Sequence, residues 1–306
     1  TPTLRATSAS RCDMVKFYAK PRKFLQGYYP GMRKLAALAL STHPGPGLAV
    51  SAIAVILGFG VGLEPWRLVL LGAAFLANQV SVGLSNDWID ADRDRAVGRT
   101  DKPVAAGRIS AAVVRNAAFV SAALAVVLTI PLGWPATLAH TAFVVSAWAY
   151  NAGLKGTALS VLPYVVSFGL LPLVVTLALP SPAPASPWAL LAGSLLGVAA
   201  HFANVLPDLE DDAATGIRGL PHRAGPRAAG LVIAGALAGA SVSIVVGLGA
   251  PQPWGWIGLA VSAVLAAACA ALVLARRPTR LIFRLIIAAA LLDVVLLALA
   301  GARILA

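Results

Sequence analysis

Long apolar runs recur along the chain from about residue 45 to its end, separated by short polar or proline-containing segments. Each run is about twenty residues long, the length that an α-helix needs to cross the hydrocarbon core of a bilayer. The runs are continuous and do not alternate between apolar and polar residues, so they do not fit the strands of a membrane β-barrel. We therefore predict an all-α integral membrane protein in which nine transmembrane helices form a bundle around a central cavity. The predicted spans are 46–63, 66–85, 110–131, 135–150, 158–179, 188–206, 228–249, 254–275 and 280–300.

The same pattern divides the chain into two parts. The longest gap between runs, 86–109, is too short for a soluble domain. Residues 46–306 are therefore predicted to form one nine-helix domain, preceded by a basic and aromatic tail over residues 1–45 that is cytoplasmic or interfacial. Within this tail, residues 15–34 interleave aromatic and basic side chains, a composition that suits the surface of an anionic bilayer. A flexible basic tail would have the same composition, so the sequence leaves both interpretations open.

The composition agrees with a membrane protein. Hydrophobic residues make up 59% of the 306 residues and charged residues 12%, and the mean hydropathy is +0.82. Soluble domains carry about twice that share of charge, roughly 25%. This composition excludes a cytosolic enzyme, a secreted disulfide scaffold, a disordered chain and an ordinary nucleic-acid-binding module. The two cysteines, Cys12 and Cys269, have no spacing that suggests a metal site.

The net charge of +12 indicates membrane lipids as partners, not nucleic acid. If the N-terminus is cytoplasmic, twenty of the twenty-four Lys and Arg residues fall in predicted cytoplasmic segments. Lys and Arg are enriched on the cytoplasmic side of membrane proteins. The basic residues therefore orient the predicted bundle, with the ends of its second, fourth and sixth helices in the cytoplasm.

Nine of the twelve acidic residues lie in two short segments at the predicted cytoplasmic ends of the second and sixth helices. The first reads NDWIDADRD over residues 86–94, followed by Asp101, and the second reads NVLPDLEDD over residues 204–212. A helical turn of about 100° per residue places Asp87, Asp90 and Asp94 on one face and Asp92 nearly opposite. In the second segment it places Asn204, Asp208, Asp211 and Asp212 together, with Glu210 off that face and His201 one turn earlier. The spacing of the two segments suggests two related four-helix halves plus a final helix.

Several carboxylates on one helical face repel each other and need water or cations. Oxygen ligands favour Mg²⁺ or Ca²⁺, and Mg²⁺ commonly completes its coordination with water and substrate phosphates. Basic residues follow both acidic segments, so the pattern predicts a site for a diphosphate. Two solvated loops that merely cap the bundle are the disfavoured alternative, because the acidic spacing occurs twice.

The motifs Asn86-Asp87-x-x-Asp90-x-x-x-Asp94 and Asp208-x-x-x-Asp212 resemble the paired aspartate motifs of the UbiA family of intramembrane prenyltransferases. The segment from Arg99 to Ser110 is similar to the family segment after the first motif, and Tyr150 with Lys155 resembles its tyrosine–lysine loop. Many members open the first helix with Arg-Pro, whereas this chain has His43-Pro44. The resemblance implies transfer of a prenyl group from a polyprenyl diphosphate to an acceptor, usually a ring in quinone, haem or chlorophyll synthesis.

The resemblance also implies roles for individual residues. Mg²⁺ would be held by Asp87, Asp90, Asp94, Asp208 and Asp212, which are also the expected catalytic carboxylates. Tyr150 or a carboxylate would help to remove a proton from the acceptor. The residues expected to bind substrate are Asn86, Arg99, Lys102, Lys155, Asn204 and Arg223. An aromatic, quinone-precursor-like acceptor is expected, with the active site towards the cytoplasm of a bacterial membrane.

Two alternatives stay open on the sequence alone. A terpene cyclase on the same scaffold would ionise a prenyl diphosphate without an acceptor. A secondary transporter is suggested only by Asp293, deep in the last predicted helix, because transporters place ionisable groups near the midplane of the membrane. His140 and Cys269 are expected to pack within the bundle, and Gln79 lies on the same side of its helix as Asn86.

Overall fold

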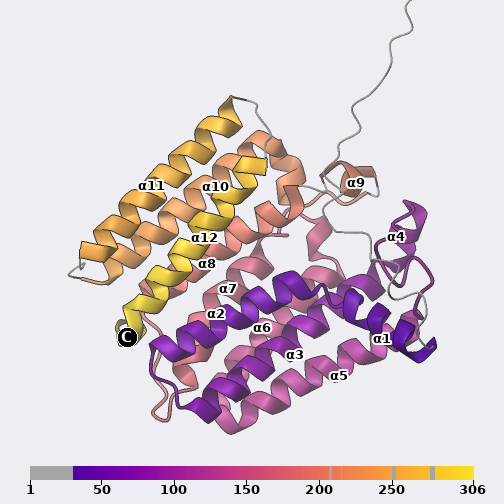
Figure 1. Ribbon diagram of the computed structural model, residues 1–306, viewed down its shortest axis with the longest axis horizontal. Helices are drawn as coiled ribbons and strands as arrows, with labels where there is room; N and C mark the ends of the chain where they lie inside the picture. Colours follow the sequence, from indigo (N-terminus) through magenta and orange to yellow (C-terminus); the bar gives the residue numbers. More distant parts are fainter. Residues whose placement is uncertain (1–29, 207–208, 215, 250–252, 276–279) are drawn as a thin grey trace, which may run out of the picture.

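The computed structural model describes residues 30–206, 209–214, 216–249, 253–275 and 280–306. Within these ranges the chain is helical apart from its turns and one isolated bridge between Ala185 and Leu305 (Figure 1). The predicted all-helical fold is therefore confirmed. Most of the tail and Asp208 lie outside the described residues.

Each predicted apolar run coincides with a helix. These helices are α2 (Pro44–Gly60), α3 (Pro65–Ile89), α5 (Ala111–Thr129), α6 (Trp134–Ala152), α7 (Leu162–Leu177), α8 (Pro187–Val205), α10 (Leu220–Gly247), α11 (Pro253–Leu274) and α12 (Arg280–Ala300). Three short helices, α1 (Pro30–Ser41), α4 (Ala91–Ala96) and α9 (Leu209–Ala214), lie outside the runs. Among the described helices, five are long and apolar enough to cross a membrane, or six if the bent pair α1–α2 counts as one span. The count of nine crossings stays a prediction.

Local sequence signals set the helix ends. Pro44, Pro65 and Pro187 each stand in the first turn of their helix, where a missing backbone N–H costs nothing. Ser110 caps α5 by accepting a hydrogen bond from the Val113 amide at 3.4 Å. The long helices are thus bounded by residues that the apolar pattern alone does not show.

Seven helices form a closed ring in the described part of the chain. Going round it, α2 packs on α3, α3 on α6, α6 on α7, α7 on α8, α8 on α10, α10 on α12, and α12 returns to α2. Helix α5 packs outside the ring against α3 and α6, and α11 packs outside it against α10 and α12 (Figure 1). The two predicted four-helix halves therefore differ in arrangement. The helix outside the ring is α5, the third long helix, in the first half, and α11, the fourth long helix, in the second half.

Helices α7 and α8 approach each other along a line of glycines. A Cβ atom added to Gly197 would lie 2.4 Å from the carbonyl oxygen of Tyr164, and one added to Gly193 would lie 2.4 Å from that of Phe168. Only glycine allows backbones to come this close. The contact fixes Tyr164 and the C-terminal part of α8 on the wall of the ring.

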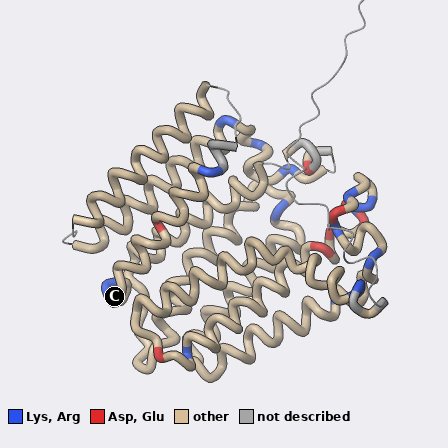
Figure 2. The backbone as a smooth tube through the Cα atoms, viewed as in Figure 1, with Lys and Arg blue, Asp and Glu red and all other residues tan. Residues whose placement is uncertain are grey.

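Charged residues gather at one end of the bundle (Figure 2). We call this the polar end; it comprises the α3–α4 junction, the loop 97–110, the turn 153–160 after α6, and the segment from α9 to the start of α10. The sides of the bundle carry exposed apolar residues such as Phe119, Val246 and Val264, as a lipid-facing surface requires. The predicted acid-rich cap is present at this end.

The orientation of the polar end can be tested by labelling. Single cysteines at Val97 and Ala213 on the polar end and at Ser181 on the opposite loop would be introduced into a protein with Cys12 and Cys269 replaced by Ser. In intact cells, a membrane-impermeant maleimide is expected to label only the cysteine at position 181, because the basic residues place the polar end in the cytoplasm. Labelling of position 97 or 213 in intact cells would contradict the predicted orientation.

Candidate active site

An apolar cavity of about 400 Å³ lies inside the helix ring. All seven ring helices line it, from Pro46, Tyr150 and Asn204 near the polar end to Leu57 and Leu297 deeper in the bundle. The predicted central cavity is therefore confirmed. Its few polar side chains are Gln79, Ser167 and Asn204 and the tyrosines Tyr150 and Tyr164.

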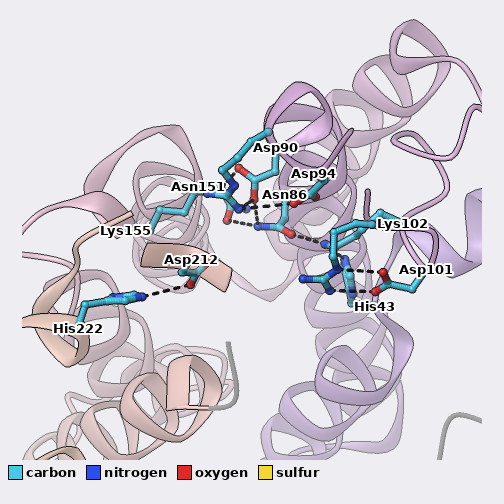
Figure 3. A network of polar contacts seen from close by, with 12 residues as sticks. His43, Asn86, Asp90, Asp94, Asp101, Lys102, Asn151, Lys155, Asp212 and His222 are labelled. Carbon is cyan, nitrogen blue, oxygen red and sulfur yellow. Dashed lines mark hydrogen bonds and ion pairs between the residues drawn. The ribbon is translucent and has the colours of Figure 1, made fainter. Parts of the chain in front are cut away.

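Asp90 lies at the junction of α3 and α4, where two cationic side chains, Lys155 and Arg93, contact it. Its carboxylate accepts hydrogen bonds from Lys155 Nζ and from Asn86 Nδ2 at 2.9 Å, and Arg93 Nη2 lies 3.0 Å away (Figure 3). The residue is 5% exposed. A buried carboxylate needs such partners, since an unpaired charge would be costly there.

Asn86 links Asp90 to the opposite side of the polar end. Its Oδ1 accepts from Lys102 Nζ at 2.9 Å, and its Nδ2 also lies 3.4 Å from Asn151 Oδ1 (Figure 3). Asn151 is itself anchored on α3, because its Nδ2 donates to the Val82 carbonyl and to Ser85 Oγ. Asn151 was not predicted as a site residue. The sequence indicates it only as a polar residue directly after Tyr150, at the end of an apolar run.

Lys155 reaches Asp90 from the turn after α6. This turn follows Gly153 and forms a short 3₁₀ helix, Leu154–Gly156. Burial lowers the pKa of Lys155, and the neighbouring Asp90 opposes part of that change. The tyrosine–lysine pair of the family motif therefore brings the lysine to the first acidic segment.

Asp87 and Asp94 differ from Asp90 in their surroundings. Asp94 lies 3.8 Å from Arg93, and burial, with the nearby charge of Asp90, raises the pKa of its carboxyl group. Asp87 is fully buried and accepts a hydrogen bond from the Val104 amide at 3.4 Å, so it faces the loop 97–110 and not Asp90. One oxygen of each, Asp87 Oδ1 and Asp94 Oδ2, is buried without a hydrogen-bond partner among the described residues.

The second acidic segment contributes Asp212. This residue stands on α9, and its Oδ2 lies 3.5 Å from His222 Nε2 at the start of α10 (Figure 3). Tyr150, on the cavity wall, is close enough to both Asp90 and Asp212 for each carboxylate to act on it electrostatically. Both acidic segments therefore lie at the polar end of the cavity. His222 was not identified from the sequence, which offers no motif for it.

Two predicted substrate-binding arginines are engaged by other groups of the polar end. Arg99 forms a two-pronged ion pair with Asp101, with both N–O distances 2.9 Å, and this pairing lowers the pKa of Asp101. Arg223 is exposed and donates to the Arg218 carbonyl. Lys102 contacts Asn86 directly, and Lys155 and Arg93 contact Asp90 directly.

The comparisons with known proteins decide the family. A family model described as the UbiA prenyltransferase family matches residues 47–301. The chain belongs to this family. The predicted membership of the UbiA family is thereby confirmed, and the protein is an integral membrane protein.

Its relatives include the bacteriochlorophyll synthase 33 kDa chain of Cereibacter sphaeroides, which is 32% identical over 200 residues. The match covers 60% of this chain and about 63% of the length of that relative. Solved structures with the same fold include a UbiA homolog from Archaeoglobus fulgidus bound to GPP and Mg²⁺, with a TM-score of 0.65, 16% identity and coverage of 90% of this chain and 99% of that chain. A second is the apo UbiA homolog from Aeropyrum pernix K1, with a TM-score of 0.61, 19% identity and coverage of 89% and 97%.

The donor set at the polar end of this UbiA chain fits a hard cation such as Mg²⁺. No group of three or more His, Cys, Asp or Glu side chains gathers as a metal site within the described residues, which exclude Asp208 and the side chains of Glu210 and Asp211. The two carboxylate oxygens without partners, Asp87 Oδ1 and Asp94 Oδ2, are ligands of the type that Mg²⁺ prefers. At Asp90, by contrast, Lys155 and Arg93 already balance the charge.

Proposed function

We propose that this protein transfers a prenyl group from a polyprenyl diphosphate to an aromatic, quinone-precursor-like acceptor within the membrane, and that the reaction needs Mg²⁺. The observation that carries the proposal is the meeting of carboxylates and lysines at the mouth of an apolar cavity. A prenyl diphosphate has the matching shape, because one end is strongly anionic and the other is a hydrocarbon chain. The Archaeoglobus fulgidus homologs with GPP and Mg²⁺ and with DMAPP and Mg²⁺ support the same conclusion.

In this proposal Mg²⁺ is held by Asp87, Asp90, Asp94 and Asp212, together with Asp208 as the motif implies, and the unpartnered oxygens Asp87 Oδ1 and Asp94 Oδ2 are available as ligands. When bound, Mg²⁺ supplies Lewis-acid neutralisation of the departing diphosphate. Asp87 keeps the loop 97–110 in place through the Val104 amide. That loop carries Lys102, so Asp87 also helps to hold Lys102 in place, although its side chain does not face Asp90.

The lysines stabilise negative charge on the leaving group. Lys102 and Lys155 are both largely buried, with 8% of Lys102 and 10% of the Lys155 side chain exposed. Ammonium groups in such water-poor surroundings interact more strongly with a diphosphate than they would in bulk water. Asn86 orients Lys102, and Asp90 orients Lys155.

The cavity holds the prenyl chain and keeps water from its reactive carbon. Its lining is almost entirely apolar, so the chain is bound by burial of hydrocarbon surface. Tyr150, Tyr164 and Phe168 form an aromatic wall, with the Tyr150 and Tyr164 rings edge to face at 5.2 Å. An aromatic acceptor packs favourably on such rings. A nearby carboxylate then accepts the proton that the acceptor loses, and the Tyr150 hydroxyl helps to relay it.

The test uses purified protein in lipid nanodiscs with prenyl diphosphates of several lengths and a panel of aromatic acceptors, followed by mass spectrometry of the lipids. We expect a linear prenylated product that requires both Mg²⁺ and an acceptor, and its loss when a chelator removes the metal. A metal-independent product would contradict the metal requirement. A cyclic hydrocarbon or alcohol formed without an acceptor would show a terpene cyclase.

A further inference from the structure

The junction between α1 and α2 holds a residue in an unusual conformation. His43 has φ 51° and ψ 62°, in the left-handed region, at the point where the two helices bend by 60°. Every other described residue with positive φ is a glycine. A non-glycine residue in this region is strained, so the surrounding structure must hold it there.

Tight packing on α3 holds the junction. A Cβ atom added to Gly83 would lie 2.1 Å from the Thr42 carbonyl oxygen, so the chain just before His43 rests directly on the α3 backbone. Gly83 precedes Asn86 by three residues, about one helical turn. The junction is thus seated beside the first acidic motif.

The His43 side chain contacts Lys102. The Nε2 atom lies 2.9 Å from Lys102 Nζ, and the same ammonium group donates to Asn86 Oδ1 at 2.9 Å (Figure 3). An ammonium group can only donate, so the imidazole nitrogen must be the acceptor. Burial, with the adjacent Lys102 charge, lowers the pKa of His43 to about 4, which keeps the ring neutral and able to accept.

Two fixed hydrogen bonds define the direction of the remaining N–H of an ammonium group, because its geometry is tetrahedral. Within the part of the chain that the structure describes, the two acceptors of Lys102 stand on different elements, His43 on the α1–α2 junction and Asn86 on α3. A lysine side chain is otherwise flexible and loses entropy when it is fixed. Holding it in advance lowers the cost of binding an anion.

We infer that His43 is a positioning residue, which aims the Lys102 ammonium group at the leaving diphosphate. This inference rests on the proposed function. The neutral imidazole accepts from Lys102 and fixes its direction. The unusual backbone conformation of His43 is explained by the same contact.

Three substitutions separate the acceptor from the backbone conformation. His43→Gly permits positive φ and removes the acceptor, and His43→Asn tolerates the same region but has a side chain too short to reach Lys102. His43→Gln carries an acceptor at about the reach of Nε2. The glycine and asparagine variants should therefore lose the hydrogen bond that holds Lys102, and the glutamine variant should retain more of it.

The first measurement does not depend on turnover. The intact protein in nanodiscs is treated with a water-soluble acetylating reagent, and the labelling rates of single lysines are followed by mass spectrometry. We expect Lys102 to be labelled at least threefold faster in His43→Gly and His43→Asn than in the wild type, with His43→Gln close to the wild type. Lys155, buried to a similar degree and held by Asp90, is the internal control and should keep its rate. Equal acceleration of both lysines, or no change at Lys102, would overturn the inference.

The second measurement is kinetic. His43→Gly should lower kcat/KM for the prenyl diphosphate about tenfold, the size expected for a hydrogen bond to a charged group. The KM for the acceptor should stay unchanged. In a Lys102→Gln background the same His43 substitution should have little further effect, since its target is gone. Additive losses in the double variant would show that His43 does not act through Lys102.

The two measurements also separate this inference from the proposed function. If the wild-type protein forms no prenylated product with any donor and acceptor, the proposed function and the diphosphate role of Lys102 both fail, whatever the labelling shows. If the wild type is active but labelling of Lys102 does not respond to His43, only the inference fails.

Discussion

Replacing Asp90 by Asn is expected to reduce prenyl transfer by about a hundredfold to a thousandfold, with the protein still inserted in the membrane. Asp90 accepts from Lys155 and Asn86 and pairs with Arg93, so its charge organises three side chains of the proposed site. The amide keeps the size of the side chain and removes the charge that these cations and the metal require. The measurement is product formation at saturating Mg²⁺, with detergent-extracted protein quantified by fluorescence-detected size exclusion.

Asp92→Asn is the matched control for this change. Asp92 lies two residues further along, its side chain is 97% exposed, and it pairs only with Arg95 in the described structure. An exposed ion pair of this kind contributes little, about 0–1 kcal/mol. Activity within about twofold of the wild type is expected. Equal losses in the two variants would show that the charge of the whole segment matters and not the position of Asp90.

Gly197→Ala is expected to lower the free energy of unfolding by about 1–3 kcal/mol, because the new methyl group would overlap the α7 backbone. Its Cβ atom would lie 2.4 Å from the Tyr164 carbonyl oxygen and 3.0 Å from Phe168 Cβ. The two helices must separate, and this moves Tyr164, on the wall of the cavity, and His201, whose ring packs against Tyr164 at 4.9 Å. The temperature at which half the protein aggregates after brief heating should fall by several degrees, and activity should fall at temperatures where the protein is still folded.

Gly235→Ala provides the comparison within a helix. Gly235 lies in α10, is exposed, and has no neighbouring atom within 4 Å of an added Cβ. Alanine favours the helical conformation over glycine by about 0.5–1 kcal/mol, so this variant should be as stable as the wild type or more so. A similar loss of stability in both variants would mean that helix separation is not the cause.

The helices of this UbiA protein were predictable from sequence because hydrocarbon imposes one requirement on every span. Apolar runs of about twenty residues have few alternatives to a helix in a membrane. The short helices α1, α4 and α9 were not predicted, since they lie in polar or mixed segments where no periodic signal distinguishes a short helix from a loop. The position of α5 and α11 outside the ring could not be predicted either, because the order of helices along the chain does not specify which of them face the cavity.

Only the part of the candidate site that lies on a single helix could be predicted from the sequence. Asn86 and Asp90 are four residues apart on α3, and the structure joins them as the helical spacing predicted. The spacing argument was less successful for Asp87, which turns to the loop 97–110, since a helical wheel does not show which neighbouring segment covers a face. Contacts between distant segments, such as those of Asn151 and His222, depend on the tertiary fold and left no local pattern.

The pairing of Asp90 with Lys155 and Arg93 has a consequence for how the protein is made. Many metal-binding domains cannot fold before the ion arrives, because their ligands repel one another without it. Here two basic side chains of the chain itself act as counter-ions for Asp90, a buried carboxylate of the first motif. A newly synthesised chain can therefore close its polar end during insertion, and in the proposed reaction the metal and the diphosphate would replace these internal counter-ions at a preassembled site.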